Sequence, residues 1–420
     1  MKNKELWDLA VIGGGPAGMM AAGRAAEKGA KVILIEKNNS LGKKLRITGG
    51  GRCNVTNAEY DNRKLLSKYK DAEQFLFSAF SEWGVKDTFD FFEKRDMPIK
   101  IEALQRAFPA SDSAESVWNV LVEYLKENNV EVLSDSEVVS IKSEKNLITK
   151  IVLKSGKEIY AKNFVLATGG KSREETGSTG DGFIWLKDLG HKVIEPNASL
   201  VPVAIKDKWV KKLSGVSLQK VKISVIQNNI KHKVSKGKIL FTHFGISGPT
   251  ILNLSREIGE LLEYDGVVIS LDILPELDNG MLNNKLQEIF KVECNKKIKN
   301  SLDSLMPTSV VNEALEISKV DPEKKCNSIT RDERIKLVDT IKNMKMKVDG
   351  LLGSDKAIIT SGGVDLKEVN FKTMQSRLFP NLYLIGDILN IDRPSGGYSL
   401  QLCWTTGFVA GNSIRKTLDQ

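Results

Sequence analysis

Cysteine is scarce in this sequence, and its few positions are not arranged for metal binding or redox chemistry. The four cysteines, Cys53, Cys294, Cys326 and Cys403, lie far apart and include no C-x-x-C pair. This spacing argues against a zinc site and against a dithiol redox centre. We therefore expect reduced thiols that are mostly buried.

Long apolar runs are also absent. No uninterrupted run approaches the roughly 20 residues that span a bilayer. The N-terminal MKNKELWDLA leads directly into an expected strand and leaves no room for a signal peptide. Apolar residues make up 41% and charged residues 27% of the 420 residues, which is typical of a globular protein. We expect a soluble cytoplasmic protein of two or three domains, with no membrane partner.

The chain carries a formal net charge of +9. Such an excess can indicate a nucleic-acid partner or a membrane surface. Here the lysines are spread along the chain, often beside acids, and we interpret them as a solvated surface without a compact basic tract. We expect a small-molecule substrate and no nucleic acid. The sequence does not indicate an oligomeric state.

The motif that organises the chain lies in Leu9–Lys37, LAVIGGGPAGMMAAGRAAEKGAKVILIEK. An apolar strand, a G-x-G-x-x-G turn, an alanine-rich helix and a second apolar strand follow one another. Gly13 allows a tight turn, Gly15 lets the backbone approach a pyrophosphate, and Gly18 lets helix and strand pack closely. The helix N-terminus favours an anion, and Glu36 stands where an acceptor for a ribose hydroxyl is expected. This combination predicts dinucleotide binding.

Several later stretches can complete such a site. Lys37–Asn57 is a polar, glycine-rich segment whose amides and cations could line an anionic cofactor. Phe164–Gly170 reads as a buried strand that runs into a glycine turn, and Gly177–Gly182 (GSTGDG) opens a helix. Asn381–Gly386 is a last buried strand that is followed at once by Asp387. Ligands of doubly wound folds meet the carboxyl ends of strands, so the two ends of the chain are expected to build one site.

The order of elements predicts inserted domains. Residues 64–96 read as a helical pair, 113–128 as an amphipathic helix, and 130–143 as a strand of a small meander. We expect the N-terminal part of a nucleotide-binding domain at 1–190, a β-rich barrel-like domain at 191–280 and an inserted helical domain at 281–346. Residues 347–420 would return through the barrel edge to the first domain.

Together these motifs resemble glutathione-reductase-like FAD-binding proteins, and most closely the BaiN/YhiN-like flavoproteins. That family includes L-aminoacetone oxidase and bile-acid 3-dehydro Δ4,6-reductase. The stretches that carry the resemblance span nearly the whole chain: GGGPAG, LGKKLRITGGGRCNVTN, ATGG, GSTGDG, THFGISGP, SGGV and SGGYSLQ. The resemblance implies an α/β fold, with a discontinuous glutathione-reductase-like FAD-binding Rossmann domain, an inserted β-barrel-like domain and a small helical domain.

The resemblance also implies non-covalent FAD and a set of contacts to it. The glycine turn would meet the pyrophosphate, Glu36 the adenosine ribose, Val138 the adenine, and Asp387 the ribitol. The residues expected to contact FAD are Gly13, Gly15, Pro16, Ala17, Gly18, Glu36, Lys37, Lys44, Thr48, Gly50, Arg52, Asn54, Val138, Thr168, Gly169, Asp181, Gly386, Asp387, Gly397, Tyr398 and Ser399. No metal is expected.

We expect an FAD-dependent oxidoreductase that transfers hydride to a small organic substrate. Because the chain has a single Rossmann motif, NAD(P)H would visit the substrate face as a transient donor, as in a BaiN-like reductase. An aminoacetone-type amine oxidase that uses O₂ is the alternative within this class. An RNA-modifying flavoprotein, prompted by the positive charge, and a non-catalytic flavin-binding protein remain alternatives from other classes.

The catalytic residues are the least determined part. His243 has a side chain suited to acid–base chemistry near neutral pH, but ordering the THFGISGP loop is the favoured role. Tyr398 could donate to a substrate carbonyl or merely cover the flavin, and Arg393 could place a cation near the ring. Arg52 could bind an acidic substrate or only the cofactor phosphates.

Overall fold

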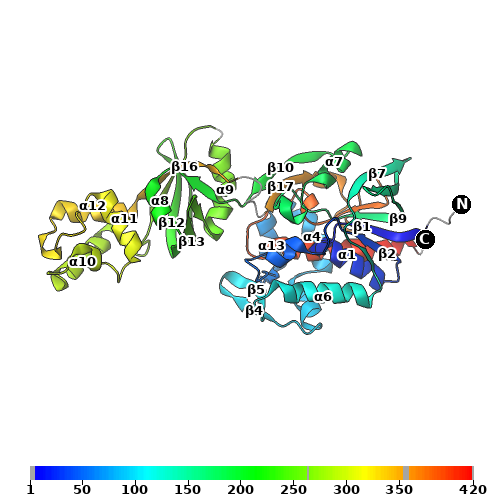
Figure 1. Ribbon diagram of the computed structural model, residues 1–420, viewed down its shortest axis with the longest axis horizontal. Helices are drawn as coiled ribbons and strands as arrows, with labels where there is room; N and C mark the ends of the chain where they lie inside the picture. The colour runs from blue at the N-terminus through cyan, green and yellow to red at the C-terminus, as the bar shows by residue number, and fades with distance from the viewer. Residues whose placement is uncertain (1–4, 263, 353–358, 419–420) are drawn as a thin grey trace. The chain divides into compact units, whose positions relative to one another are not determined.

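The computed structural model describes residues 5–262, 264–352 and 359–418, coloured in Figure 1. The chain divides into two compact units. Unit 1 consists of Met1–Ser199 and Ser354–Gln420, and unit 2 of Leu200–Gly353. The sequence predicted the first crossing after residue 190 and a return through the barrel edge over residues that begin at 347.

The core of unit 1 is a parallel sheet. Its strands run in the order β6-β2-β1-β9, and β18 pairs with the far side of β9. The central strands β1, β2 and β18 and the second half of β9 are apolar runs buried on both faces, as expected where helices cover a parallel sheet, whereas the edge strand β6 is largely exposed. Their bounds are β1 (Leu6–Ile12), β2 (Val32–Ile35), β6 (Glu131–Leu133), β9 (Glu158–Leu166) and β18 (Leu382–Leu384).

Helix α1 (Pro16–Glu27) connects β1 to β2 and is the main helix packed on this sheet. Proline stands at its first position, where no helical N–H is needed, and Gly29 follows its end with a positive φ of 92°. Helix α1 packs against α13 (Tyr398–Leu418) and α6 (Ala114–Glu127). In Figure 1 the labels of α13 and α6 lie near that of α1, although α13 comes from the opposite end of the sequence.

An antiparallel meander, β7 (Val138–Glu144), β8 (Leu147–Leu153) and β9, extends the sheet. The sequence predicted one strand over residues 130–143, and this prediction was wrong. Asp135, with φ of 49°, turns the chain between β6 and β7. The first half therefore joins the parallel sheet beside β2, and only the second half enters the meander.

Residues 43–127 form a largely helical layer with a small sheet. Most of its aromatic side chains are buried in the core that α1 and α13 share, among them Phe80, Phe89, Phe91 and Phe92, whereas Phe77 is 55% exposed. Its elements are α2 (Lys43–Ile47), β3 (Thr56–Asn57), α3 (Asn62–Leu66), α4 (Glu73–Glu82), α5 (Val85–Glu93), β4 (Ile99–Glu102), β5 (Arg106–Pro109) and α6. Helix α7 (Asp181–Asp188) and the pair β10 (Val193–Ser199) and β17 (Ile359–Val364) complete unit 1.

Unit 2 is a closed barrel with a helical insertion. The strand order is β11-β14-β13-β12-β15-β16, and β12 and β13 form its long hairpin, labelled in Figure 1. The strands are β11 (Val203–Ile205), β12 (Ser217–Gln227), β13 (Ile230–Thr242), β14 (Gly245–Ser247), β15 (Val268–Asp272) and β16 (Met344–Leu351). The helices are α8 (Lys208–Lys212), α9 (Pro249–Leu262), α10 (Asn279–Val292), α11 (Thr308–Ser318) and α12 (Arg331–Lys342).

Candidate functional site

A cavity lies in unit 1 where the carboxyl ends of β1, β2, β9 and β18 meet. Its empty space, including the open mouth, is about 1260 Å³. The predicted residues that line it are Gly13, Gly15, Pro16, Ala17, Glu36, Lys37, Lys44, Thr48, Val138, Thr168, Gly169, Asp181, Gly386, Asp387 and Ser399.

The three glycines of the turn between β1 and α1 have different steric roles. Gly13 has a φ of +107°, and a Cβ there would lie 2.4 Å from the Ala167 carbonyl oxygen. A Cβ on Gly18 would lie 1.9 Å from the Gly13 carbonyl oxygen, so Gly18 keeps α1 close to the turn. A Cβ on Gly15 would meet nothing within 4 Å of it. Gly15 therefore faces open cavity, beside the N–H groups at the start of α1 that have no helical partner.

Glu36 is buried at the end of β2 and orders two neighbouring loops. Its Oε2 accepts a hydrogen bond from Gly14 N at 2.8 Å, and its Oε1 accepts from Asn38 N at 2.8 Å and Asn38 Nδ2 at 2.7 Å. A carboxylate has about four acceptor positions, so capacity remains for ribose hydroxyls. Sequence reasoning missed Asn38, which also lines the cavity.

Two lysines on the cavity wall are each held by partners from distant loops. Lys37 Nζ donates to Asp181 Oδ2 at 2.9 Å and to Thr179 Oγ1 at 2.6 Å. Burial raises the pKa of Asp181, but the hydrogen bonds from Thr179 and Lys37 outweigh it and leave the pKa below its usual value. Lys44 Nζ donates to Ser172 Oγ at 2.7 Å.

Asp387 follows β18 and is half of a buried ion pair. It bonds Nη2 of Arg393, whose side chain is fully buried, and lies 3.6 Å from Lys44 Nζ. Arg393 also donates to the Ile391 carbonyl oxygen at 2.6 Å and to Ser399 Oγ at 3.0 Å. Burial raises the pKa of Asp387, but the charges of Arg393 and Lys44 outweigh it, so the pKa lies below its usual range. Asp387 is therefore an ionised acceptor for hydroxyl groups.

Thr168 shows that the cavity is fitted for a polar ligand. Its hydroxyl is buried and finds no hydrogen-bond partner among the described residues. Such a group costs free energy unless it gains a partner, and Thr168 lines the cavity. With the open position at Gly15 and the acceptors at Glu36 and Asp387, the wall matches the diphosphate and hydroxyl groups of FAD.

The predicted cofactor contacts Gly18, Gly50, Asn54, Gly397 and Tyr398, and the catalytic candidate Arg393, do not line this cavity. A Cβ on Gly397 would lie 2.2 Å from the Thr56 carbonyl carbon, so glycine lets the start of α13 approach β3. Tyr398 is buried, and its carbonyl oxygen accepts from Tyr69 Oη at 2.8 Å. Burial raises the pKa of the Tyr398 hydroxyl, so this group stays protonated.

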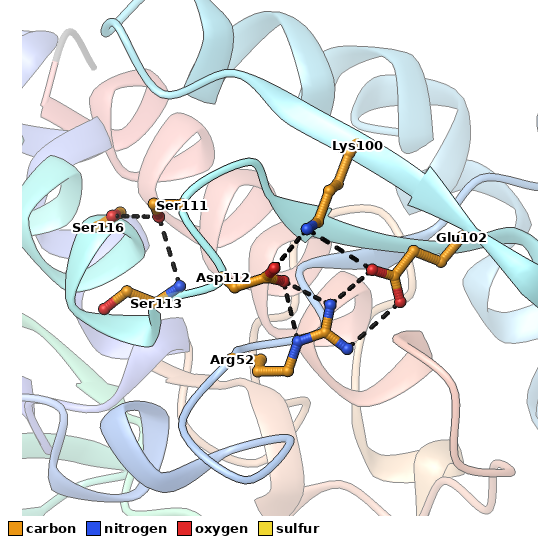
Figure 2. A network of polar contacts seen from close by, with 7 residues as sticks. All are labelled: Arg52, Lys100, Glu102, Ser111, Asp112, Ser113 and Ser116. Carbon is orange, nitrogen blue, oxygen red and sulfur yellow. Dashed lines mark hydrogen bonds and ion pairs between the residues drawn. The ribbon is translucent and has the colours of Figure 1, made fainter.

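Arg52 is held by a surface ion-pair network, which corrects the expectation that its guanidinium faces the cofactor. It binds Glu102 at 2.5 Å and also Asp112, and Lys100 binds the same two carboxylates. Figure 2 shows the guanidinium between them, at the β4–β5 hairpin. The guanidinium also stacks over Phe108 at 4.2 Å. Its charge is already neutralised, and its position serves to fasten the loop after Thr48 to the hairpin.

We predict that Arg52→Gln leaves FAD affinity within about twofold of wild type, because the side chain binds carboxylates and not the cavity. Fluorescence titration of the apo-protein with FAD measures this. Lys44→Gln, which removes a cation from the cavity wall, is the matched variant and should weaken binding. If the Arg52 variant lost affinity as strongly as the Lys44 variant, the guanidinium would have to contact the cofactor.

His243 lies in unit 2, on the exposed turn between β13 and β14. Its ring packs edge-on against Phe244, with 4.9 Å between centroids. The turn is closed by Thr242, whose Oγ1 accepts from Gly245 N at 3.2 Å. The loop-ordering role that the sequence considered for His243 therefore falls to Thr242.

The two thiols near the glycine-rich segments are inert. Burial raises the pKa of Cys53 to about 12 and that of Cys403 to about 12. Both stay protonated at neutral pH and are poor nucleophiles. Cys403 nevertheless lines the cavity, so it contributes packing there. Within the described residues, no group of three or more histidine, cysteine or acidic side chains could hold a metal ion.

The fold has known counterparts. A solved 3-ketosteroid-Δ4-(5α)-dehydrogenase from Rhodococcus jostii RHA1, in complex with 4-androstene-3,17-dione, superposes with a TM-score of 0.53. The alignment covers 99% of this chain and 98% of that one, at 15% identity. In the described part of this chain, no helix is long and apolar enough to cross a membrane. The predicted α/β fold with a Rossmann domain is confirmed.

The family follows from the sequence match. The model of the HI0933-like protein Rossmann domain matches residues 7–413, so this chain belongs to the HI0933-like family. The Escherichia coli K12 ribosomal RNA dihydrouridine synthase is 27% identical over 98% of both chains. The 3-dehydro-bile acid Δ(4,6)-reductase of Clostridium scindens is 28% identical over 96% of this chain and 98% of its own. The predicted family is thereby confirmed.

Proposed function

We propose that this enzyme reduces a carbon–carbon double bond conjugated to a carbonyl group, with NAD(P)H as the electron donor. The observation that supports this most is a chemistry shared by its two kinds of full-length relative. A 3-dehydro-bile acid Δ(4,6)-reductase acts on double bonds conjugated to a 3-keto group. A dihydrouridine synthase saturates the uracil double bond, which is conjugated to the ring carbonyl.

The conjugation decides where the electrons and protons go. A carbonyl group withdraws electron density, so the β carbon accepts hydride and the α carbon then takes a proton. Overall, NAD(P)H loses a hydride and becomes NAD(P)⁺, and the substrate gains that hydride and one proton from solvent. FAD, when bound, supplies a carrier that accepts hydride from the nicotinamide and delivers it to the substrate.

The chain's own residues bind and orient the cofactor in this proposal. The start of α1, opened by Gly15, would meet the diphosphate, and Asp387 would accept hydrogen bonds from the ribitol. Arg393 donates a hydrogen bond to Ser399 and forms an ion pair with Asp387, which fixes both side chains. Its buried guanidinium also places a positive charge next to these two residues. A buried cation near a reduced ring stabilises negative charge on it. Because Arg393 does not line the cavity and acts through Asp387 and Ser399, it is a positioning residue.

The test separates the two half-reactions. We predict that NADH or NADPH, added anaerobically to the FAD-loaded protein, bleaches the flavin, and that a conjugated 3-keto steroid restores its colour with formation of the saturated product. The corresponding saturated ketone is the control and should leave the flavin reduced. Peroxide formation from aminoacetone and O₂, without turnover of the enone, would contradict the proposal in favour of an amine oxidase.

A second candidate is reduction of uridine in RNA. It is favoured by the net charge of +9 and by ribosomal RNA dihydrouridine synthases of Escherichia coli and Haemophilus influenzae, which match 98% and 97% of this chain. The sequence alone led us to expect no nucleic acid. Incubating the protein with uridine-containing RNA and NADPH, followed by mass spectrometry of the nucleosides, distinguishes this substrate from a small enone.

A further inference from the structure

The positive charge is concentrated in one part of unit 2. Between residues 206 and 238 the only acidic residue is Asp207, against a run of lysines: Lys206, Lys208, Lys211, Lys212, Lys220, Lys222, Lys231, Lys233, Lys236 and Lys238. This tract covers the end of β11, helix α8 and the β12–β13 hairpin. It corrects the expectation that the lysines are spread along the chain, often beside acids, and form no compact basic tract.

The hairpin gathers four of these lysines on one face of the barrel. Lys222 on β12 stands directly opposite Lys236 on β13, and directly opposite residues point to the same side of a sheet. Lys238 lies two residues further along β13, and alternate residues share a face. Lys220 lies where the register of β12 shifts, but Val221 between Lys220 and Lys222 is buried, so Lys220 points outward like Lys222. Lys220, Lys236 and Lys238 are exposed, and Lys222 is half-buried. We call these four residues the lysine face.

The lysine face is not neutralised by the protein itself. Among the described residues, none of the four forms an ion pair. The acid beside Lys222 on the neighbouring strand is Asp272, and Lys342 already holds it at 2.7 Å. Like charges directly opposite each other destabilise a sheet. The arrangement therefore opposes folding slightly, and an external polyanion would relieve the repulsion.

We propose that the lysine face binds the phosphate backbone of a folded RNA. Lysines two residues apart on a strand are about 6.6 Å apart, similar to the spacing of successive phosphates. Lysine ammonium groups contact phosphates without reading sequence, so this surface would supply affinity while the substrate base is chosen elsewhere. The proposal rests on the RNA candidate above, but it concerns binding by unit 2 and not the redox step.

The experiment measures binding of a labelled RNA hairpin to the FAD-loaded full-length protein between about 50 and 200 mM salt. The test variant is K220Q/K222Q/K236Q/K238Q. The control is K285Q/K291Q/K325Q/K336Q, which removes the same charge from exposed positions among the helices of unit 2. Each phosphate contact contributes about 0.7–0.9 to the slope of log affinity against log salt. We expect the test variant to lower the slope by about 3 and the control to keep it.

Several results would overturn the proposal. The proposal would be wrong if the salt dependence of RNA affinity had the same slope in wild type and the test variant, or if the slope fell equally in the test and control variants. It would also be wrong if the RNA hairpin did not bind at low salt. Tighter binding to phosphatidylglycerol vesicles than to RNA would assign the surface to a membrane instead. NADPH-dependent bleaching of the flavin, measured on the same samples, should be unchanged in both variants. Its loss in wild type would count against the redox proposal and not against RNA binding.

Discussion

Gly15→Ala should abolish tight FAD binding while leaving the apo-protein as stable as wild type. The added Cβ meets no protein atom within 4 Å, and the backbone of Gly15 is extended, with φ of −78°, which alanine adopts freely. The methyl group would instead occupy the space where the diphosphate approaches α1. Hydrogen bonds to charged groups contribute about 1.5–3 kcal/mol each. Losing two of them weakens binding by roughly 100-fold or more.

Gly18→Ala is the variant to compare with Gly15→Ala, because its added methyl group should affect stability as well as FAD affinity. Its Cβ would lie 1.9 Å from the Gly13 carbonyl oxygen, so α1 must move, at a cost of about 1–3 kcal/mol. This variant should lose both FAD affinity and apo-protein stability. Gly266→Ala, also with nothing within 4 Å of its Cβ, should change neither. Thermal unfolding and FAD titration of the three proteins check the pattern, and full FAD affinity in Gly15→Ala would contradict it.

Arg393→Met should be the most destabilising single change in the site. Arg393 is fully buried, and removing it leaves Asp387 beside Lys44 alone. Breaking one side of a buried ion pair costs about 3–5 kcal/mol. The double variant Asp387→Asn/Arg393→Met removes the uncompensated charge and should recover most of this loss. Unfolding of the four proteins of the cycle, without flavin, measures the coupling. Additive losses would show that the pair does not act as a unit.

Wild type and the Arg393→Met variant should also differ in how their folding stability depends on pH. In wild type the pKa of Asp387 is lowered, so its ionised form stabilises the fold above the unfolded value near 3.9 and this contribution disappears as pH falls. In Arg393→Met, burial dominates and the pKa of Asp387 rises. The stability of that variant should therefore decrease as pH rises past about 4, the opposite direction. A variant with the wild-type pH dependence would contradict this account.

The parts of the site that could be predicted are those fixed by neighbouring residues. The spacing of Gly13, Gly15 and Gly18 determines a turn between β1 and α1, and Glu36 ends the adjacent strand. Asp387 was predictable for the same reason, because it follows a buried strand whose carboxyl end must face the ligand edge of the sheet. Each depends on local backbone geometry that a single sequence shows.

The rest depends on side chains that are distant in sequence. Arg52 was expected at the cofactor because it is a cation in a polar, glycine-rich segment, but its partners are Glu102 on β4 and Asp112 in the loop after β5. Ser172 and Thr179 reach the cavity lysines in the same way. No periodicity or spacing relates such residues, so only the folded chain reveals them.

The basic tract had a signal in the sequence. Over the whole chain the lysines are balanced by many acids, 62 basic against 53 acidic residues, which hides a local excess. Within residues 206–238 alone, lysines far outnumber acidic residues, and this excess can be read from the sequence. The register of β12 with β13 adds what the sequence could not give, because it places Lys222 and Lys236 opposite each other.

The most direct test of the account compares FAD with FMN. FMN carries the same reactive ring and ribitol but lacks the second phosphate and the adenosine. If the turn at Gly15 and the acceptor Glu36 hold a dinucleotide, the apo-protein should bind one FAD per chain tightly and FMN at least 100-fold more weakly, since two or more charged hydrogen bonds are missing. Equal affinity for FMN and FAD, or no binding of FAD, would contradict the central claim.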